Sequence, residues 1–464
     1  MSKLKKQMFT NKRITVMGLG CFGGGIGVSR FLVNQGAFVT VTDLRNEGEL
    51  SSSLKQLEGL PIVYRLGGHH DEDFIHADMV IVNPAVPENS RFLQIALNNR
   101  VSVETEINIF FALCPAPIIG VTGSNGKSTT TGLIGTMLGQ TSRRVWIGGN
   151  IGKSLLTGLE EIKPQDIVVL ELSSFQLKRL SSIQRSPHVS AITNLSPNHL
   201  DRHSGMDDYI QSKKNIILYQ HENDYAVINY DDPELRKWED ECRGRILWYS
   251  TKEKVRNGVF VENDDVVVSL DHQMKKIACL SAVKMPGIHN IQNILAASGA
   301  AYLAGAEESH IGGGIAAFTG LEHRLEFVSV VHGIQYFNDS KATTPESAIA
   351  AIRAFREPVI LIAGGGDKGS DFDEFASVCV KCTKAIILMG TTAKKIYGLI
   401  QRKMPEAGRP LLFMANTLNE AFHRATTVAK TGDVILLSPA CASYDMFQNY
   451  EERGRQFKQL VQAL

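Results

Sequence analysis

The sequence has no large excess of charge of either sign. It contains 49 Lys and Arg residues against 48 Asp and Glu residues, which gives a formal net charge of only +1 at pH 7. Proteins whose main partner is a nucleic acid or an acidic membrane usually carry a clear basic excess. We therefore expect neither kind of partner, and any anionic ligand must be held by a local group of residues.

Long hydrophobic runs are also missing. No stretch of 18 or more apolar residues occurs, and the basic N-terminus, MSKLKKQMFTNKR, has no apolar core and no cleavage site of small residues. These absences predict a soluble cytoplasmic protein.

The seven cysteines do not form the pattern of a disulfide framework, because their number is odd and they are scattered along the chain. The one close pair, Cys379 and Cys382, has no second pair near it and falls in an amphipathic helical pattern. We expect it to pack rather than to bind a metal or act in redox chemistry.

The segment from Ile14 to Arg45 contains a nucleotide-binding turn. An apolar strand over residues 14–17 leads into Gly18, Gly20 and Gly23, and a second strand over residues 38–42 ends at Asp43. The glycines permit a tight turn close to a diphosphate, the following helix offers its N-terminus, and an acid can bind a ribose. The pattern leaves NAD and other nucleotides equally open.

A second phosphate loop lies in GVTGSNGKSTT. Strict P-loop spacing would need a glycine at Val121, which the chain lacks. The physical features of such a loop are still present, since small residues let backbone N–H groups surround a polyphosphate, Lys127 supplies a positive charge and the Ser128 hydroxyl can reach Mg²⁺. ATP or a similar triphosphate is expected here, contacted by Gly123, Ser124, Asn125, Gly126, Lys127, Ser128 and Thr129.

Polar residues follow the next two strands of this region. Glu171 emerges from an apolar strand, where a lone carboxylate is costly, and its place after the phosphate loop suits a Mg²⁺ ligand. The strand VSAITNL ends in SPNHLDRH, which places Asn198, His199, Asp201 and His203 at the carboxyl end of the sheet, where α/β proteins bind ligands. Lys213 and Lys214 fall on a predicted helix, whose pattern by itself indicates a solvated face.

Strands and helices alternate along most of the chain, which predicts an α/β fold. The length of 464 residues corresponds to about three domains. A break at CPAP, residues 114–117, ends the first alternating region. We therefore expect three mainly parallel sheets flanked by helices in domains 1–112, 113–320 and 321–464, with the phosphate loop in the central one. Three polar loops of the last domain, in FNDSKATTPES, LIAGGGDKGSDF and SPACASYDMFQNYEERG, predict a site that closes by domain docking.

The motifs occur in the order found in the Mur ligases of peptidoglycan synthesis. GVTGSNGKST, GGNIG, LELSSFQL, HLDRH, GIHNIQNILAA, HRLEF, NDSKAT and SPACASYDMFQNYEERG carry this resemblance over nearly the whole chain. NDSKAT and SPACAS resemble the members that add D-glutamate, and the DNPR-like motif of the members that add diaminopimelate or lysine is absent. The resemblance implies three α/β domains, the central one a P-loop-type ATPase fold. It also implies a monomeric ligase that uses ATP and two Mg²⁺ ions to join D-glutamate to UDP-N-acetylmuramoyl-L-alanine.

The resemblance also implies roles for individual residues. The UDP substrate would contact Gly18, Gly20, Gly23, Asp43, Leu44, Arg45, Asn150 and Ser173. Beyond the phosphate loop, ATP would contact Asn293, Arg324, Asp339 and Lys341, and D-glutamate would contact Thr343, Lys368, Ser443 and Tyr450. The Mg²⁺ ions would be held by Ser128, Glu171, His199 and an N-carboxylated Lys213. Lys127, His199 and Lys213 would be the catalytic residues.

Three alternatives remain at this point. A related ligase could add another amino acid or act on folate, although a folate-type enzyme would lack the first domain. An NAD-dependent oxidoreductase would have no use for the Lys127 loop. A non-catalytic nucleotide sensor would need neither Glu171, His199 nor the three loops of the last domain.

Overall fold

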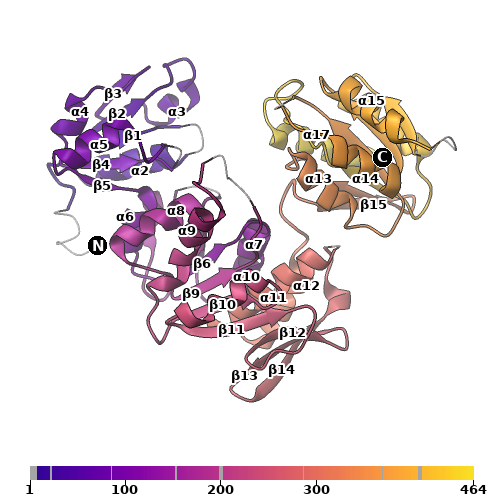
Figure 1. The fold of residues 1–464 in the computed structure, drawn as a ribbon, viewed down its shortest axis with the longest axis horizontal. Helices are drawn as coiled ribbons and strands as arrows, with labels where there is room; N and C mark the ends of the chain where they lie inside the picture. The colour runs from indigo at the N-terminus through magenta and orange to yellow at the C-terminus, as the bar shows by residue number, and fades with distance from the viewer. Residues whose placement is uncertain are drawn as a thin grey trace. The chain divides into compact units, whose positions relative to one another are not determined.

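The computed structural model describes residues 8–20, 23–84, 86–151, 154–197, 202–285, 287–367, 369–405 and 410–464. Within these residues the strands form three sheets, each flanked by helices (Figure 1). Internal contacts divide the chain into two compact units. One unit contains Met1–Ala278 and Gln292–Ile315, and the other contains Cys279–Ile291 and Ala316–Leu464.

The first sheet has the order β3-β2-β1-β4-β5, with parallel pairing throughout. Because the order reverses beside β1, a ligand crevice is expected at the carboxyl end of this strand. The strands are β1 (Arg13–Met17), β2 (Phe38–Asp43), β3 (Ile62–Leu66), β4 (Met79–Val82) and β5 (Ser102–Glu104). The helices are α2 (Gly24–Asn34), α3 (Ser51–Gln56), α4 (Glu72–Ile75), α5 (Arg91–Asn98) and α6 (Glu106–Leu113).

The central sheet has the order β14-β13-β12-β11-β10-β9-β6-β8-β7. Pairing is parallel from β7 to β12 and antiparallel between β12 and β13. Strands β6 and β8 are buried along their whole length, as expected for apolar strands covered on both faces. The strands are β6 (Ile118–Thr122), β7 (Val145–Gly149), β8 (Ile167–Glu171), β9 (Val189–Ile192), β10 (Tyr225–Asn229), β11 (Arg245–Ser250), β12 (Gly258–Glu262), β13 (Asp265–Leu270) and β14 (Gln273–Cys279).

Helices of several lengths connect the strands of the central sheet. The α-helices are α7 (Lys127–Leu138), α8 (Ser174–Leu180), α9 (Met206–Leu218), α10 (Pro233–Arg236), α11 (Ile288–Leu303) and α12 (Glu308–Ala317). Short 3₁₀ helices are η1 (Leu155–Glu161), η2 (Ser181–Ile183), η3 (Glu239–Glu241) and η4 (Leu280–Ala282). The break expected at residues 114–117 lies between the end of α6 and the start of β6, because prolines there cannot donate to a helix or a central strand.

The third sheet has the order β15-β16-β20-β17-β18-β19 and is parallel except for the β15–β16 pair. The strands are β15 (Glu326–Val331), β16 (Ile334–Asn338), β17 (Val359–Gly364), β18 (Thr383–Met389), β19 (Leu411–Met414) and β20 (Val434–Leu437). The helices are α13 (Pro345–Ile352), α14 (Asp373–Cys382), α15 (Ala393–Lys403), α16 (Leu418–Val428) and α17 (Tyr450–Gln462). Two apolar clusters, one on each face, form its core. The expected three-domain α/β architecture is confirmed.

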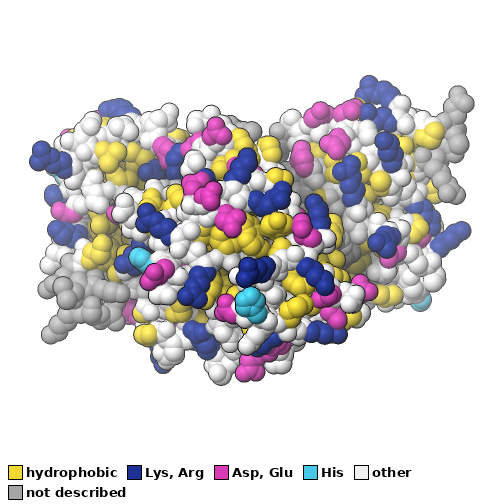
Figure 2. Space-filling view, turned by 60° about the horizontal axis from the view of Figure 1, so that its bottom comes forward, with side chains coloured by type: hydrophobic (Ala, Val, Ile, Leu, Met, Phe, Trp, Pro, Cys, Tyr) yellow, Lys and Arg dark blue, Asp and Glu magenta, His cyan; other side chains and the backbone are white. Residues whose placement is uncertain are grey.

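The described helices include none that is both long and apolar enough to cross a membrane. Figure 2 shows Lys and Arg side chains interspersed with Asp and Glu on the face that is drawn, in keeping with the balanced composition. Cys379 belongs to α14 and is buried in the core, as expected for a packing role, whereas Cys382 at the end of that helix is exposed.

The interpretation of Lys213 and Lys214 as a solvated face is wrong. Both side chains are buried on α9. The Lys214 ammonium forms an ion pair with Glu241 at 2.7 Å and lies 5.7 Å from the ring centroid of Trp238. Packing of α9 against the central sheet, which the helical pattern does not reveal, accounts for the difference.

Candidate active site

The carboxyl ends of three central strands meet at one edge of the sheet. In the parallel register, Val121 of β6 pairs with Glu171 of β8, and Thr122 pairs with Ile192 of β9. The residues that directly follow these strands therefore lie side by side, at the edge where parallel α/β sheets bind ligands.

The phosphate loop that follows β6 depends on its glycines. Gly123 has a φ of 144° and Gly126 a φ of 84°, values that other residues rarely adopt. A Cβ on Gly123 would lie 1.9 Å from the Thr193 hydroxyl, and one on Gly126 would lie 2.2 Å from the Asn293 amide oxygen. Asn293 of α11 thus lies against the loop that begins α7.

The segment after β9 holds the phosphate loop in place. The backbone N–H groups of Ser124 and Asn125 donate to the backbone and side-chain oxygens of Asn194, at 2.8 and 3.0 Å. The Thr193 hydroxyl donates to the Asn125 carbonyl at 2.5 Å. Sequence analysis passed over Thr193 and Asn194, whose only signal is their position after a strand of the same sheet.

Two lysines converge on one carbonyl oxygen of the loop. Lys127 Nζ donates to the carbonyls of Gly123 and Ser124 at 3.0 and 2.9 Å, and Lys213 Nζ donates to the Gly123 carbonyl at 2.9 Å. Lys213 is 1% exposed. Burial, helped by the charge of Lys127 and opposed by Glu171, lowers the pKa of Lys213 well below its usual value. A neutral amine is therefore accessible at this position.

Glu171 is buried beside these lysines, and its two carboxylate oxygens differ in their hydrogen bonds. The residue is 2% exposed, and its Oε1 accepts a hydrogen bond from the Asn150 amide at 2.8 Å. Its Oε2 is buried and accepts no hydrogen bond from the described residues. A buried carboxylate oxygen without a donor is costly, so the position is suited to a cation. Ser128, in the first turn of α7, is also buried and offers the hydroxyl oxygen that Mg²⁺ accepts as a ligand.

Part of the expected metal set lies outside the described residues. Asn198, His199 and Asp201 belong to that part of the chain, as does Lys368 of the third sheet. No group of three or more His, Cys, Asp and Glu side chains suited to a metal occurs among the residues that are described. Ser173 is described, and its hydroxyl caps α8 by accepting from the Gln176 N–H, while Gln176 accepts from the Ser173 N–H.

The first glycine turn is shaped by the acid expected to bind a ribose. Gly18, Gly20 and Gly23 all have positive φ. Asp43 at the end of β2 is buried, with one oxygen accepting from the Gly20 N–H and the other from the Arg45 N–H, each at 3.0 Å. Asp43 thus organises the backbone of the turn, and Leu44 beside it is 71% exposed.

The second unit brings Asp339, Lys341 and Arg324 near one another. Asp339 at the end of β16 accepts from the Leu325 N–H at 3.0 Å and from the Ser438 hydroxyl at 2.7 Å. Burial outweighs these bonds and the nearby Arg324 charge, and it raises the pKa of Asp339 to about 7. The Lys341 N–H donates to the His323 carbonyl, and Lys341 Nζ lies 5.8 Å from the ring centroid of Tyr450.

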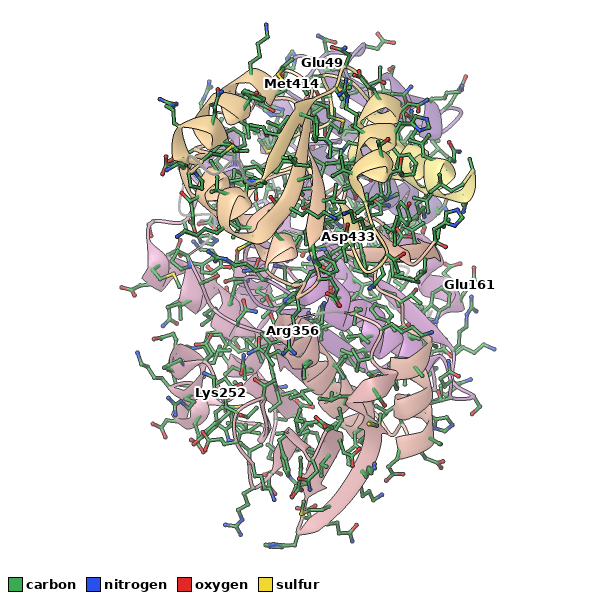
Figure 3. All side chains as sticks on the ribbon, turned by 90° about the vertical axis from the view of Figure 1, so that its right-hand side faces the viewer. Glu49, Glu161, Lys252, Arg356, Met414 and Asp433 are labelled. Atoms are coloured by element: carbon green, nitrogen blue, oxygen red, sulfur yellow. The ribbon has the colours of Figure 1, made fainter. Side chains whose placement is uncertain are left out.

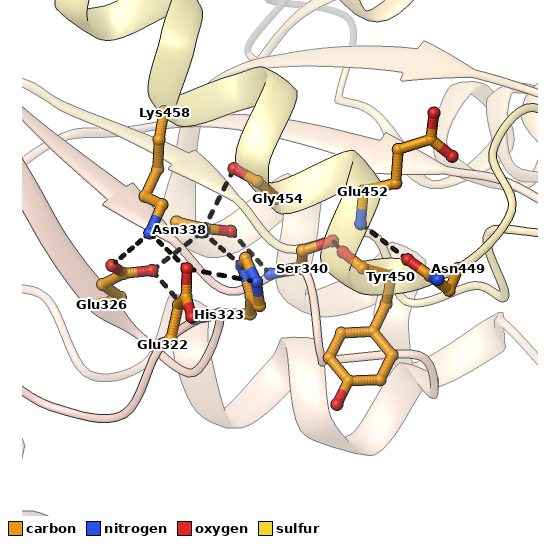
Figure 4. Close-up of polar contacts among 10 residues, drawn as sticks. All are labelled: Glu322, His323, Glu326, Asn338, Ser340, Asn449, Tyr450, Glu452, Gly454 and Lys458. Carbon is orange, nitrogen blue, oxygen red and sulfur yellow. Dashed lines mark hydrogen bonds and ion pairs between the residues drawn. The ribbon is translucent and has the colours of Figure 1, made fainter. Parts of the chain in front are cut away.

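A polar network holds the segment that carries Arg324. His323 has a φ of 65° and Leu325 a φ of 43°, an unusual conformation on both sides of this arginine. In Figure 4, His323 lies against Asn338, whose amide donates to Glu326, and Lys458 of α17 bridges Glu322 and Glu326. The network fixes a backbone that the residue types alone would not favour.

Sequence analysis missed Arg453, which holds together two of the loops expected to form the site. It is 0% exposed, and its guanidinium donates to the carbonyl and hydroxyl oxygens of Ser340 at 2.8 and 2.9 Å. It also donates to the carbonyls of Cys441 and Ala442 at 3.3 Å. These contacts tie NDSKAT to SPACAS, the loops that carry Thr343 and Ser443. The sequence shows only an arginine in the EERG turn of a helix. Composition does not distinguish a buried arginine at this position from a solvated one.

Comparisons with known proteins give one consistent family. Sequence models of the Mur ligase MurD-like N-terminal domain, the Mur ligase middle domain and the Mur ligase glutamate ligase domain match residues 12–105, 121–301 and 323–441. Proteins called UDP-N-acetylmuramoylalanine–D-glutamate ligase from Clostridium tetani and Roseiflexus sp. are 41% and 42% identical to the chain. The alignments cover 99% and 97% of the chain and 98% of each relative.

Solved structures share the fold at low sequence identity. The UDP-N-acetylmuramate-alanine ligase of Thermotoga maritima aligns with a TM-score of 0.60 at 18% identity, covering 98% of the chain and 100% of that structure. A pseudomurein peptide ligase type C from Methanothermus fervidus aligns with a TM-score of 0.56, also at 18% identity, covering 97% of the chain and 100% of that structure.

Proposed function

The chain belongs to the Mur ligase family, and we propose on this basis that it is the ATP-dependent ligase that joins D-glutamate to UDP-N-acetylmuramoyl-L-alanine in peptidoglycan precursor synthesis. The convergence of Lys127, Lys213 and Glu171 at one sheet edge is the observation that carries an ATP-dependent reaction. NDSKAT and SPACAS favour D-glutamate as the amino acid.

Lys127 and the loop from Gly123 to Thr129 bind the polyphosphate of ATP. In the described conformation Lys127 Nζ is held by two loop carbonyls at the start of α7, within reach of a phosphate bound there. Asn293 borders the same loop. Arg324, Asp339 and Lys341 are further ATP contacts, and Thr343, Lys368, Ser443 and Tyr450 bind D-glutamate.

Glu171 and Ser128 fit a Mg²⁺ ion, because a buried carboxylate oxygen without a donor and a buried hydroxyl are the hard oxygen ligands that this ion prefers. His199 and the carbamate of Lys213 complete a two-ion set. Bound Mg²⁺ supplies positive charge that stabilises the transferring phosphoryl group.

Lys213 is the residue suited to carboxylation. Carbamate formation requires a neutral amine, and burial together with Lys127 lowers the pKa of Lys213 in that direction. Addition of the neutral amine to CO₂ forms the N–C bond, releases one proton and leaves an anionic oxygen ligand next to Lys127, whose positive charge attracts it.

The reaction uses the residues of both glycine turns. The turn over Gly18, Gly20 and Gly23, with Asp43, Leu44 and Arg45, holds the UDP end, while Asn150 and Ser173 lie nearer the reacting end of the substrate. The alanyl carboxylate attacks the γ-phosphorus of ATP, which gives an acyl phosphate and ADP. The D-glutamate amine then attacks the acyl carbon, loses a proton and forms the amide as phosphate leaves. Lys127 offsets the negative charge on the phosphoryl oxygens.

The domain limits 1–112, 113–320 and 321–464, a cytoplasmic location and a monomeric state form part of the same proposal. A ligase assay with single amino acids, with ATP and UDP-N-acetylmuramoyl-L-alanine present, tests the function. D-Glutamate should give amide and one phosphate per turnover. Faster turnover with L-alanine would identify a different family member, and binding of NADH without binding of the UDP substrate would support an oxidoreductase.

A further inference from the structure

A set of side chains on α8 and around the start of α9 joins two segments that lie apart in the sequence. The Arg202 guanidinium lies 4.3 Å from the ring centroid of Phe175. The His203 ring stacks on the same Phe175, with ring centroids 4.9 Å apart and planes inclined by 9°. Lys178 of α8 forms an ion pair with Asp208 of α9 at 2.9 Å. We call Phe175, Lys178, Arg202, His203 and Asp208 the clasp.

A hydrogen-bonded chain fixes the clasp internally. His203 contacts the Ser174 hydroxyl at 2.9 Å through Nε2 and the Asp208 carboxylate at 3.1 Å through Nδ1. Burial alone would raise the pKa of Asp208, but hydrogen bonds from Lys178, His203 and the Ser204 N–H lower it to about 2. The Ser–His–Asp order resembles a hydrolase triad, but Ser174 is 2% exposed in the first turn of α8 and cannot reach a substrate. Here the arrangement joins the starts of two helices.

One side of the clasp reaches the first glycine turn. Arg202 donates to the Pro84 carbonyl at 3.1 Å, and Lys178 pairs with Glu88 at 3.0 Å. Both partners belong to the segment after β4. In the same segment, the Asn83 amide donates to the Gly18 carbonyl at 3.2 Å, and a Cβ on Gly18 would lie only 2.9 Å from the Asn83 Cβ. The clasp is thus connected to the turn that begins the UDP site.

The other side of the clasp reaches the phosphate loop. Helix α8 begins directly after Glu171, Leu172 and the capping Ser173. Helix α9 carries both Asp208, in its first turn, and Lys213, which donates to Gly123. A displacement of the clasp would therefore move Glu171 and Lys213 relative to the first sheet.

We propose that the clasp is a positioning device that couples the two nucleotide sites, a proposal that rests on the proposed function. The UDP end and the reacting carboxylate belong to one substrate molecule. The carboxylate can meet the γ-phosphate only if the first glycine turn and the phosphate loop keep a fixed separation, and small errors in such separation reduce rates strongly. Binding of either ligand then favours the clasped arrangement and strengthens binding of the other.

The test is a thermodynamic cycle on the full chain. Calorimetry gives the Kd of UDP-N-acetylmuramoyl-L-alanine with and without saturating MgADP, and the ratio of the two is the coupling factor. Glu88→Gln removes the ion pair between Glu88 and Lys178, and Lys178→Met removes this pair together with the one to Asp208. The two changes are made alone and together. Arg202→Gln removes the guanidinium from Phe175. Lys178→Arg retains a cation and serves as the conservative variant. Glu161→Gln is the matched control, because Glu161, labelled in Figure 3, forms an exposed ion pair with Arg144 that joins nothing in the clasp.

In the wild type, MgADP should tighten binding of the UDP substrate. Lys178→Met, Glu88→Gln and Arg202→Gln should each reduce the coupling factor by about threefold to fivefold, which is the scale of one partly exposed ion pair or cation–π contact. The Kd of each ligand alone should stay within about twofold, which separates lost coupling from misfolding. The double variant Glu88→Gln with Lys178→Met should lose no more than Lys178→Met alone, because Glu88 acts on the clasp through Lys178.

Several results would overturn the inference. These are a coupling factor of one in the wild type, an unchanged factor in both Lys178→Met and Arg202→Gln, and an equal loss in the Glu161→Gln control. Failure of the proposed function has a different signature, since the wild type would then not bind UDP-N-acetylmuramoyl-L-alanine. In that case the same cycle with UDP as the probe still decides whether the clasp couples the sites.

Discussion

Replacing Lys213 by Met and by Ala should separate the catalytic value of this side chain from its effect on stability. Met fills nearly the same volume without an amine. The Gly123 carbonyl keeps its hydrogen bond from Lys127 at 3.0 Å, so the change leaves no buried acceptor unpaired. It also removes a buried amine that burial and Lys127 disfavour as a cation. We expect the Met variant to be as stable as the wild type or more stable by up to about 2 kcal/mol.

The Ala variant should be less stable than the Met variant, but its turnover should be lost to the same extent. Loss of three buried methylenes costs about 2.4 kcal/mol, and the remaining cavity raises the total to about 2–4 kcal/mol. Both variants lack the carbamate and should be nearly inactive. Acetate should partly restore turnover in the Ala variant, whose cavity can admit a small carboxylate, but not in the Met variant, whose side chain fills that space.

The assay combines urea unfolding in buffer free of CO₂ with phosphate release in the ligase reaction. Added bicarbonate should raise the urea concentration at the unfolding midpoint and the rate of phosphate release for the wild type only, because only its lysine can form a carbamate. Turnover of the Met variant above about a tenth of the wild-type rate, or destabilisation equal to that of Ala, would refute the assignment of Lys213.

Three further predictions concern other buried or charged groups. Lys127→Ala should abolish turnover while the Kd for the UDP substrate, measured by calorimetry, changes less than about twofold, because the two nucleotides use different glycine turns. Lys214→Ala should keep its kcat but lose about 1–2 kcal/mol of unfolding free energy, since the ion pair of the buried Lys214 with the half-exposed Glu241 and its packing on Trp238 are lost. A marked loss of kcat would contradict this. Burial raises the pKa of Asp339 in the folded state to about 7, above its ordinary 3.8. The free energy of unfolding of the wild type should therefore fall as pH rises from 4 through 7, by up to about 4 kcal/mol. Asp339→Asn should remove this dependence when unfolding is compared at pH 5 and pH 8.

The sequence by itself determined the architecture and the two glycine turns. Alternation of apolar strands with helical patterns follows directly from burial of both sheet faces, which is a local and periodic property. Gly123 and Gly126 could be interpreted without coordinates, because positive φ and close contact with phosphate require glycine wherever such a loop occurs. Glu171 was identifiable for a similar reason, as an acid at the end of an apolar strand.

Only the tertiary structure decided which charged side chains are buried and what they contact. Lys213, Lys214 and Arg453 lie on helices whose patterns suit solvated faces, yet each is buried by packing against distant segments. The contact of Lys213 with the Gly123 carbonyl, and the contacts of the clasp with Pro84 and Glu88, join residues about 90 or more positions apart. Long-range contacts of this kind depend on how the sheets and helices pack, and helical periodicity does not predict them.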